Sequence, residues 1–268
     1  MPEGHTIHRL ARDHTAVLVG HPVGMASPQG RFAEGAGLLS GRTCTRIDPY
    51  GKHLFYAFEG DLLLHVHLGL YGKWATGAGP PPEPRGALRL RMTCGDTWLD
   101  LRGPTACEIF TPADRAAVLA RLGPDPLRRA ADPRRAWERL SRSRSPIGQL
   151  LMDQSVLAGV GNVYRAEVLF RAGLSPFTPG TGVRRSRWDA LWEDTRTLMR
   201  AGVRSGRIVT TAPEDRDRRS GKARTTDAHY VYRRAALPCR RCGEEISTQV
   251  MAGRNLFWCP RCQAPDPG

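Results

Sequence analysis

Residues 239–262 have the sequence CRRCGEEISTQVMAGRNLFWCPRC, in which two Cys-x2-Cys pairs are separated by sixteen residues. This spacing is typical of a β-hairpin with two metal-binding turns whose four thiolates enclose one zinc ion. Gly243 and Pro260 favour the tight turns that such a site needs. We therefore expect one structural zinc ion, held by Cys239, Cys242, Cys259 and Cys262. The alternative, two disulfides, requires an oxidising compartment, for which the sequence shows no signal.

The basic residues are unevenly distributed along the chain. The chain has 268 residues, of which 40% are apolar and 25% are charged, and its formal net charge is +14. Residues 1–125 hold 13 basic and 12 acidic residues, whereas residues 126–268 hold 27 and 14. The 37 arginines and 3 lysines indicate a GC-rich genome, but such a bias would not confine the excess to one half. The distribution therefore predicts a nucleic-acid partner.

Export and membrane insertion are both disfavoured by the sequence. No window of about 18 apolar residues exists, and the start MPEGHTIHRL lacks a basic stretch followed by an apolar run. We expect a cytoplasmic protein without a membrane partner. The remaining cysteines lie in apolar surroundings and are interpreted as buried small hydrophobes: Cys44, Cys94 and Cys107.

The hydrophobic pattern changes its period along the chain. Apolar positions three and four residues apart predict a helix over 3–19, and short alternating runs between about 42 and 111 predict an antiparallel sandwich or barrel. Residues 77–86, rich in Pro and Gly, are expected to form a loop. Strand patterning stops near 121–130, where we place a domain boundary.

The second half is predicted to be helical and to end in the zinc hairpin. Helices are expected over 133–141, 146–157, 162–171 and 184–203, and the charged residues 204–232 are expected to be mobile. The fold class is α+β, a helix-capped antiparallel β-sandwich followed by a helical domain and a zinc ribbon. The expected bounds are 1–121 for the sandwich, 122–130 for a linker, 131–232 for the helical domain and 233–268 for the hairpin.

Residues 153–167, DQSVLAGVGNVYRAE, place a glycine-rich turn between two predicted helices. Gly159 and Gly161 let the backbone approach a phosphate, and the next helix offers unpaired N–H groups at its N-terminus. Asn162 is expected to cap that helix, to bind a phosphate oxygen, or to do both. Such a turn alone is more often structural, but its place between the Arg-rich residues 128–144 and the zinc hairpin favours phosphate binding.

The chain begins Met1-Pro2-Glu3, and Met1 before Pro2 is a good substrate for removal. Removal would leave Pro2 with a free secondary amine. Because α-amino groups titrate at about pH 8 and the positive end of a helix lowers the pKa further, part of this amine is neutral at neutral pH. Such an amine attacks an electrophilic C1′ or an aldehyde, with Glu3 as a candidate proton carrier. The same three residues are also an ordinary start of a helix.

Five motifs, in this order, resemble those of the formamidopyrimidine-DNA glycosylase/endonuclease VIII (Fpg/Nei) family. They are Met1-Pro2-Glu3-Gly4, a lysine in the turn Tyr50-Gly51-Lys52-His53, Gln154 with residues 159–164, Val231-Tyr232 before Pro238-Cys239, and GRNLFWCPRCQ at 253–263. The resemblance spans the whole chain. The start PEGHTIHRL and the sequence DLRGPT at 100–105 are most similar to the actinobacterial endonuclease VIII-like branch.

The resemblance implies a bifunctional DNA glycosylase and AP lyase of base excision repair, which flips out a damaged base, cuts its glycosidic bond and nicks the abasic site. It implies that the Pro2 amine attacks C1′, that Glu3 protonates the opened sugar and that Lys52 assists as a proton carrier. β- and then δ-elimination would leave a gap with phosphates on both sides. The rarity of lysine in this chain supports the role of Lys52, because arginine cannot give up a proton.

The resemblance also implies a helix-two-turn-helix domain, with DNA bound in a basic cleft between the two domains. Asn162 and Arg254 would hold phosphates that flank the lesion, and Arg254 would thereby also assist catalysis. The loop HLGLYG would insert Leu70 and Tyr71 into the space left by the flipped base, although a core aromatic is the alternative for Tyr71. Arg102 would contact the opposite strand or, as an equal alternative, form an inward salt bridge.

Two glycines depart from the family pattern. Gly69 stands where endonuclease VIII has Gln before the Leu-Tyr pair, which leaves open how the orphaned base is recognised. Gly148 stands where many relatives have a phosphate-binding Lys, and Arg142 or Arg144 would compensate for it.

The expected lesion class depends on a sequence element that residues 204–232 lack. Residues 204–232 lack the Gly-Thr-Thr-Leu element of the 8-oxoguanine branch, and their charges disfavour a snug purine pocket. We expect oxidised pyrimidines, with 8-oxoguanine or formamidopyrimidine specificity as the alternative. A catalytically silent zinc-dependent binder of damaged DNA is disfavoured by the intact Pro2, Glu3 and Lys52, and a zinc-ribbon transcription factor by the lack of a recognition helix. The expected partner is damaged DNA, double-stranded and also single-stranded, and the protein is expected to be a nucleoid-associated monomer.

Overall fold

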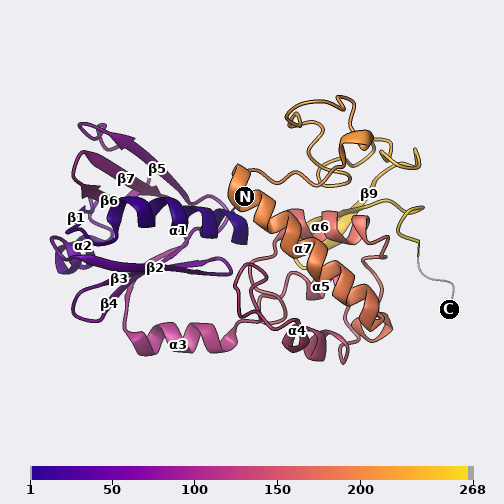
Figure 1. Cartoon of the computed structure of the whole chain (residues 1–268), viewed down its shortest axis with the longest axis horizontal. Helices are drawn as coiled ribbons and strands as arrows, with labels where there is room; N and C mark the ends of the chain where they lie inside the picture. The colour runs from indigo at the N-terminus through magenta and orange to yellow at the C-terminus, as the bar shows by residue number, and fades with distance from the viewer. Residues whose placement is uncertain (1, 265–268) are drawn as a thin grey trace. The chain divides into compact units, whose positions relative to one another are not determined.

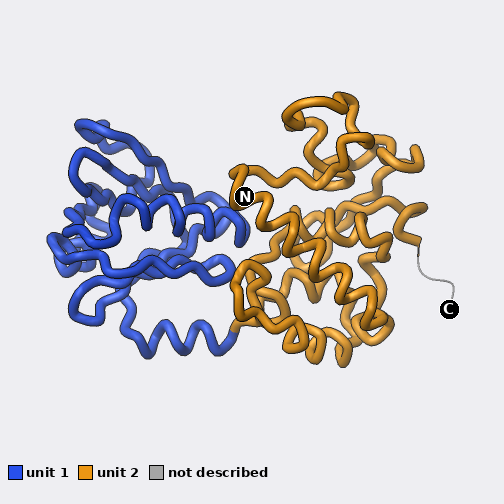
Figure 2. Tube along the Cα trace, in the orientation of Figure 1, with its two compact units in different colours: residues 1–121 blue, residues 122–268 orange. Residues whose placement is uncertain are grey.

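The computed structural model describes residues 2–264 of the chain. The chain divides into two compact units, unit 1 (Met1–Arg121) and unit 2 (Leu122–Gly268), which Figure 2 colours separately. Met1, whose removal the sequence predicts, lies outside the described residues. The finer division of unit 2 into a linker, a helical domain and a hairpin stays a prediction.

Unit 1 contains two four-stranded antiparallel sheets, with α1 packed against β2 (Figure 1). One sheet has the strand order β1-β6-β7-β5 and the other β2-β3-β4-β8. Both sheets and the helices α1 and α2 contribute to one hydrophobic core, which confirms the predicted antiparallel sandwich. The elements are α1 (Gly4–Leu18), β1 (Gly24–Ala26), α2 (Ala33–Leu39), β2 (Cys44–Tyr50), β3 (His53–Phe58), β4 (Leu62–His67), β5 (Lys73–Ala78), β6 (Leu88–Cys94), β7 (Thr97–Arg102), β8 (Ala106–Phe110) and α3 (Pro112–Arg121).

The strand β3 is buried on both faces for two different reasons. Leu54 and Tyr56 are fully buried in the core between the sheets. His53 and Phe55 point the other way, to what we call the outer face, because successive side chains of a strand alternate. Phe55 is nevertheless 1% exposed, and the Arg115 guanidinium of α3 lies 5.4 Å from the centre of its ring. The outer face at β3 is thus partly covered by α3.

The elements β1, α2 and α3 are not predicted by the hydrophobic pattern. They are short or bury little: β1 has three residues, and Val118 is the buried residue of α3. Elements with so few buried side chains leave no clear periodicity in the sequence. The loop expected over 77–86 is wrong for its first two residues, because β5 continues through Ala78 as the partner of β7.

His14 and Tyr56 form a buried polar pair in the core of unit 1. His14 Nδ1 and the Tyr56 hydroxyl oxygen are 2.7 Å apart, and His14 is 2% exposed. Burial lowers the pKa of His14 to about 4 and raises the pKa of the Tyr56 hydroxyl well above its usual value. The pair is therefore a hydrogen bond between two neutral groups.

Unit 1 is expected to lose stability as the pH falls from about 6.5 to about 4. In this interval the unfolded chain protonates His14 and the folded chain does not, so acid favours unfolding. At about 1.4 kcal/mol per pKa unit, the loss from His14 is on the order of 3 kcal/mol. Native-state hydrogen exchange of the β3 amides measures it. His14→Gln should flatten the acid slope, whereas His21→Gln, at an exposed position, should not; equal slopes in both variants would contradict this assignment.

Unit 2 is helical and ends in a two-stranded hairpin (Figure 1). Trp188 and Tyr164 are fully buried in a core that α4, α5, α6 and α7 share. None of the helices in the described part of the chain is long and apolar enough to cross a membrane. The elements are α4 (Pro133–Leu140), α5 (Ile147–Leu150), α6 (Asn162–Arg171), η1 (Gly180–Gly182), α7 (Arg185–Ser205), η2 (Pro213–Asp215), β9 (Ser247–Met251) and β10 (Arg254–Trp258).

The helix expected over 146–157 is wrong beyond its first turn. Only α5 forms there, with four residues, and turns follow over 151–158. The side chain of Gln154 organises these turns: its Nε2 donates to the Val160 carbonyl at 3.0 Å, and its Oε1 accepts from the Gly159 N–H at 2.9 Å. Buried apolar residues in consecutive turns have a spacing similar to that of a helix face. The hydrogen bonds of Gln154 that form these turns leave no periodic signal in the sequence, so the pattern predicts a helix instead.

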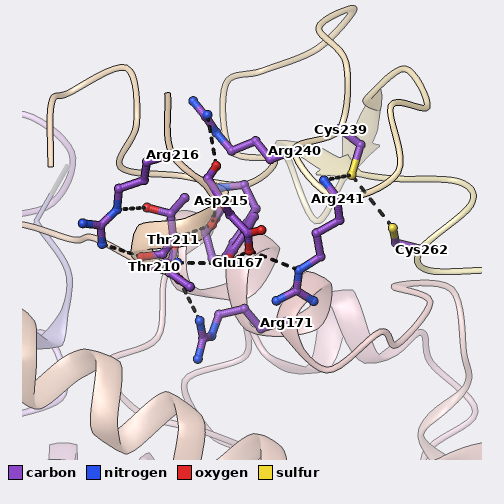
Figure 3. Close-up of polar contacts among 12 residues, drawn as sticks. Glu167, Arg171, Thr210, Thr211, Asp215, Arg216, Cys239, Arg240, Arg241 and Cys262 are labelled. Atoms are coloured by element: carbon purple, nitrogen blue, oxygen red, sulfur yellow. Dashed lines mark hydrogen bonds and ion pairs between the residues drawn. The ribbon is translucent and has the colours of Figure 1, made fainter. Parts of the chain in front are cut away.

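The segment 204–232 is expected to be mobile, and this prediction is wrong for its two ends. The carboxylate of Glu167 on α6 is fully buried and accepts hydrogen bonds from three consecutive backbone N–H groups of residues 230–232, at 2.8, 2.9 and 2.8 Å. It also accepts one from the Thr210 hydroxyl (Figure 3). A buried carboxylate with this many donors is well satisfied and holds both ends of the segment on α6.

Candidate active site and nucleic-acid-binding residues

Pro2 and Glu3 lie at the amino end of α1. Pro2 is partly buried, and Glu3 is the N-cap residue, with its side chain fully buried. The Thr6 hydroxyl accepts a hydrogen bond from the Glu3 N–H at 3.5 Å, which closes the first turn. The positive end of the helix dipole stabilises a carboxylate at this position. A buried acid therefore stands next to the residue that would carry the amine.

The turn between β2 and β3 brings Lys52 to the same end of unit 1. Val19, just after α1, pairs with Cys44 at the start of β2, and α1 packs along this strand. A helix of 15 residues is about 22 Å long and a strand of 7 residues about 23 Å, so the end of β2 reaches the amino end of α1 (Figure 1). Gly51, at φ +56, adopts the left-handed conformation that this turn requires.

The positive charge of Lys52 acts on two histidines of the outer face. The pKa of His53 is lowered to about 3, first by burial and then by His67, His65, Arg121 and Lys52. The pKa of His67 is lowered by burial, by His65 and by Lys52. Both imidazoles are therefore neutral at neutral pH and lie close to an ammonium group.

The loop after β4 presents Tyr71 to solvent. Tyr71 is 85% exposed, so the alternative of a core aromatic is wrong, and Leu70 beside it is half-buried. Gly69 has φ +65, and a Cβ there would lie 1.8 Å from the Thr105 hydroxyl oxygen. A side chain at this position would be strained by the left-handed backbone and would have to displace the Thr105 side chain. The departure from the family pattern at Gly69 thus has a local steric reason.

Arg102 forms the inward salt bridge that was one of its two alternatives. Its Nη2 lies 2.7 Å from Oδ2 of the fully buried Asp100, and its Nε donates to the Arg85 carbonyl at 3.2 Å. Arg91 binds the same carboxylate with contacts of 2.7 and 2.9 Å. Burial tends to raise the pKa of Asp100, but the hydrogen bonds and charges of these two arginines hold this pKa below its usual value. Contact of Arg102 with the opposite DNA strand stays a prediction.

Asn162 does not cap α6, contrary to one expectation, because the N-cap residue is Gly161. The Asn162 amide instead donates to the Asn255 carbonyl of β10 at 2.9 Å. Arg165, which is fully buried, donates to the Asn162 side-chain oxygen and, at 3.0 Å, to the Met251 carbonyl. These contacts attach the hairpin turn to α6 on both sides. Contact of Asn162 with phosphate stays a prediction.

Arg254 begins β10 directly after the tight turn of the hairpin. Ala252 and Gly253 in this turn have φ values of +53 and +67. The carbonyls held by α6 belong to residues 251 and 255, one on each side of the turn. The backbone that carries Arg254 is therefore fixed by the helix-two-turn-helix segment.

The four predicted zinc ligands converge on one point. Their Sγ atoms all lie within 4.8 Å of one another, with Cys239 and Cys262 at 3.9 Å and Cys242 and Cys259 at 3.4 Å. Zn–S bonds of about 2.3 Å imply tetrahedral S–S edges of about 3.8 Å. Burial raises the pKa of the Cys259 thiol to about 11, so a cation is needed to keep all four sulfurs ionised. The cluster fits one structural zinc ion.

The second departure from the family pattern, the glycine at position 148, also has a steric reason. A Cβ there would lie 2.9 Å from the Met251 sulfur and 3.0 Å from the Pro176 carbonyl oxygen, so a lysine would have to displace the Met251 side chain and crowd this carbonyl. Arg142, one of the two residues expected to compensate, lines a surface pocket of about 320 Å³ together with Arg135 and Arg139. This pocket offers three guanidinium groups from one region of unit 2.

Three residues that organise the site are not found from the sequence: Arg165, Glu167 and His65. Arg165 and Glu167 are polar residues within an otherwise apolar helix, and both are fully buried. That contrast is a usable signal, because buried charges need partners. His65 lies in an apolar strand in the same way. Their partners come from distant segments, which the sequence does not pair.

Three family models match the chain in order. The formamidopyrimidine-DNA glycosylase N-terminal domain matches residues 1–106, and the formamidopyrimidine-DNA glycosylase H2TH domain matches residues 122–213. A zinc finger found in FPG and IleRS matches residues 236–265. Together they cover the sandwich, the helical region and the cysteine cluster.

Curated relatives match over nearly full length. The chain is 51% identical to "Endonuclease 8 1" of Mycobacterium tuberculosis over 267 residues, which is 98% of this chain and 100% of the relative. It is 34% identical to "Probable endonuclease 8 2" of Streptomyces coelicolor, over 100% of this chain and 97% of the relative. It is also 34% identical to the formamidopyrimidine-DNA glycosylase of Thermus thermophilus, over 86% of each.

The fold agrees with a solved structure. The Lactococcus lactis Fpg bound to DNA with an abasic site matches with a TM-score of 0.81 at 22% identity, over 98% of this chain and 100% of that one. The sandwich, the helical region with its cysteine cluster and the full-length matches agree, and the chain therefore belongs to the formamidopyrimidine-DNA glycosylase/endonuclease VIII family of base-excision-repair glycosylases with AP lyase activity.

Proposed function

We propose that this DNA glycosylase/AP lyase removes oxidised pyrimidines, with the Pro2 amine as its nucleophile and Glu3 and Lys52 as proton carriers. The observation that carries the proposal is the common end of α1 and of the β2–β3 turn, to which all three residues belong. A nucleophile, an acid and a titratable amine at one end of the same unit are the groups that base excision through a Schiff base requires.

The first step cuts the glycosidic bond. The lone pair of the Pro2 nitrogen attacks C1′, and the C1′–N bond breaks with its electron pair going to the base, which takes up a proton. The Pro2 nitrogen loses its one N–H proton to the departing base, and opening of the sugar ring then converts the adduct to an iminium ion, which stays charged because the nitrogen has no further proton to lose. Glu3 gives a proton to the ring oxygen, and Lys52 carries protons beside the sugar and the phosphate.

The second step nicks the strand. The iminium ion withdraws electrons, so a proton leaves C2′ and the 3′ phosphate is expelled by β-elimination. Loss of the 5′ phosphate by δ-elimination follows, and water then releases Pro2 from the sugar fragment. Phosphates remain on both sides of the gap, which is the product expected from β- and then δ-elimination.

DNA is held by groups from both units. Asn162 and Arg254 bind phosphates beside the lesion, which gives affinity without sequence preference. Tyr71, exposed on its loop, stacks in the space left by the flipped base, with Leu70 beside it and Arg102 towards the opposite strand. A bound zinc ion holds the hairpin that carries Arg254. We further propose that the protein acts as a monomer, accepts single-stranded DNA and is associated with the nucleoid.

The lesion class is tested with matched oligonucleotides under single-turnover conditions. Thymine glycol and dihydrouracil have lost aromaticity and stack poorly, so extruding them costs less than extruding normal thymine. Release of thymine glycol, dihydrouracil and 5-hydroxycytosine should exceed release of 8-oxoguanine opposite cytosine by about tenfold, which is about 1.4 kcal/mol. Faster release of 8-oxoguanine than of any pyrimidine lesion would assign the chain to the other branch.

A further inference from the structure

Three residues of the outer face form a chain of hydrogen bonds that the mechanism above does not use. His65 Nδ1 on β4 lies 3.3 Å from Oε2 of Glu108 on β8, and His65 Nε2 lies 2.9 Å from Nδ1 of His53 on β3. We call these residues the histidine chain. The register of the sheet creates it, because His65 stands opposite Glu108 on one side and, on the other, is the diagonal neighbour of His53, which pairs with His67.

The histidine chain determines which ring nitrogen of each histidine carries the proton. His65 is 4% exposed, and the pKa values of His65 and His53 are both lowered by burial, so each ring is neutral and has one N–H group. A carboxylate only accepts hydrogen bonds, so the His65 proton is on Nδ1. His65 Nε2 is then an acceptor, and His53 must donate to it from Nδ1. The lone pair of His53 is left on Nε2.

The other end of the histidine chain lies beside Lys52. His53 follows Lys52 directly, and its ring centre is 5.0 Å from that of His67, the second ring on which the Lys52 charge acts. The other charged groups that face these rings are Arg121 of α3, which acts on His53, and Glu108. An ammonium group has three N–H donors and no acceptor, so a lone pair on His53 Nε2 attracts it and an N–H there would repel it.

We propose that Glu108 and His65 are positioning residues that hold His53 with its proton on Nδ1, so that the Nε2 lone pair faces the surroundings of Lys52 and keeps this amine in place for proton transfer. The inference rests on the proposed function of Lys52. Among residues 2–264, the side chains that converge as a metal site are the four cysteines, and the histidine chain is not part of that group. The side chain of Glu108 is 54% exposed, so the residue that sets the tautomers of His65 and His53 lies at the surface.

The tautomer is tested directly by long-range 1H–15N NMR spectra of the full, zinc-loaded protein. In the wild type, His53 should show one form, with the proton on Nδ1. Glu108→Gln keeps the size of the side chain, but an amide both donates and accepts, so it serves either tautomer of His65 equally. In this variant His53 should become a mixture. Wild-type His53 with its proton on Nε2 overturns the inference, whatever the enzyme does.

The kinetic consequence is tested with Glu59→Gln as the matched control, since it removes the same charge from an exposed turn of the same unit. Glu108→Gln should slow single-turnover base release about fivefold, the size of one lost hydrogen bond, and borohydride trapping on a preformed abasic site by less than about twofold. Glu59→Gln should change neither. Equal losses in both variants, or a mixed tautomer with unchanged base release, overturn the inference. If Lys52→Ala leaves base release intact, the proposed function fails instead, while the NMR result stands on its own.

Discussion

A protein that keeps a residue in front of Pro2 is expected to lose Schiff-base trapping on abasic DNA by about a thousandfold, which corresponds to about 4 kcal/mol of barrier. The physical reason is that an amide nitrogen has no basic lone pair, so acylated Pro2 cannot attack C1′. An amino-terminal tag provides the change, and the same tag at the carboxyl end is the control. Mass spectrometry of the trapped adduct identifies the residue that is bound to the sugar.

Binding should be affected much less than chemistry by this change. Asn162 and Arg254, which we propose as phosphate contacts, belong to unit 2, whereas Pro2 belongs to unit 1. The affinity for an abasic-site analogue that cannot react should therefore stay within about threefold of the wild type. Full trapping activity in the protein with an extended amino end would reject Pro2 as the nucleophile, and a lysine found in the adduct would name its replacement.

Cys259→Ser is expected to release zinc and to weaken DNA binding by about a hundredfold. Three thiolates and a hydroxyl bind zinc poorly, and the hairpin that carries Arg254 is short, so metal binding supplies much of its folding free energy. Elemental analysis should find one zinc per chain in the wild type and less than about a tenth of that in the variant. DNA binding is measured at a stated salt concentration, because phosphate contacts depend steeply on salt.

The loss of zinc should leave unit 1 intact. Its core is separate from the cysteine cluster, so the hydrogen exchange of the β3 amides should not change in Cys259→Ser. Cys94→Ser is the matched control: Cys94 is partly buried in unit 1, and its thiol donates to the Val17 carbonyl at 3.3 Å. This variant should keep its zinc. A wild-type protein without metal, or with two disulfides among these cysteines, would contradict the zinc site.

Elements with a continuous buried face are predictable from the sequence. The helix α6 runs over the predicted residues 162–171, and β3 lies within the short apolar runs predicted between about 42 and 111, because both elements are densely buried and bounded by turn residues. The helix expected over 146–157 fails for the opposite reason. There the turns are closed by the side chain of Gln154, and a single polar residue has no period.

The sequence by itself determined the groups whose members are close along the chain or fixed by a spacing. The two Cys-x2-Cys pairs place four sulfurs around one point, and the amino-terminal Pro2-Glu3 needs only the start of α1. Local geometry restricts such groups strongly, so their arrangement follows from residue type and spacing. Lys52 is placed in the same way, by the short turn that follows β2.

Only the tertiary structure decided the partners of buried charges. Asp100 of β7 binds Arg91 of the neighbouring strand β6, Glu167 holds backbone from more than sixty residues away, and Glu108 reaches His53 through His65 across three strands. These pairings depend on strand register and on which faces are covered, and a slip of one residue would move every side chain to the opposite face. Because a buried charge accepts any well-placed donor, its partner follows from the packing of distant segments and not from the residues around it.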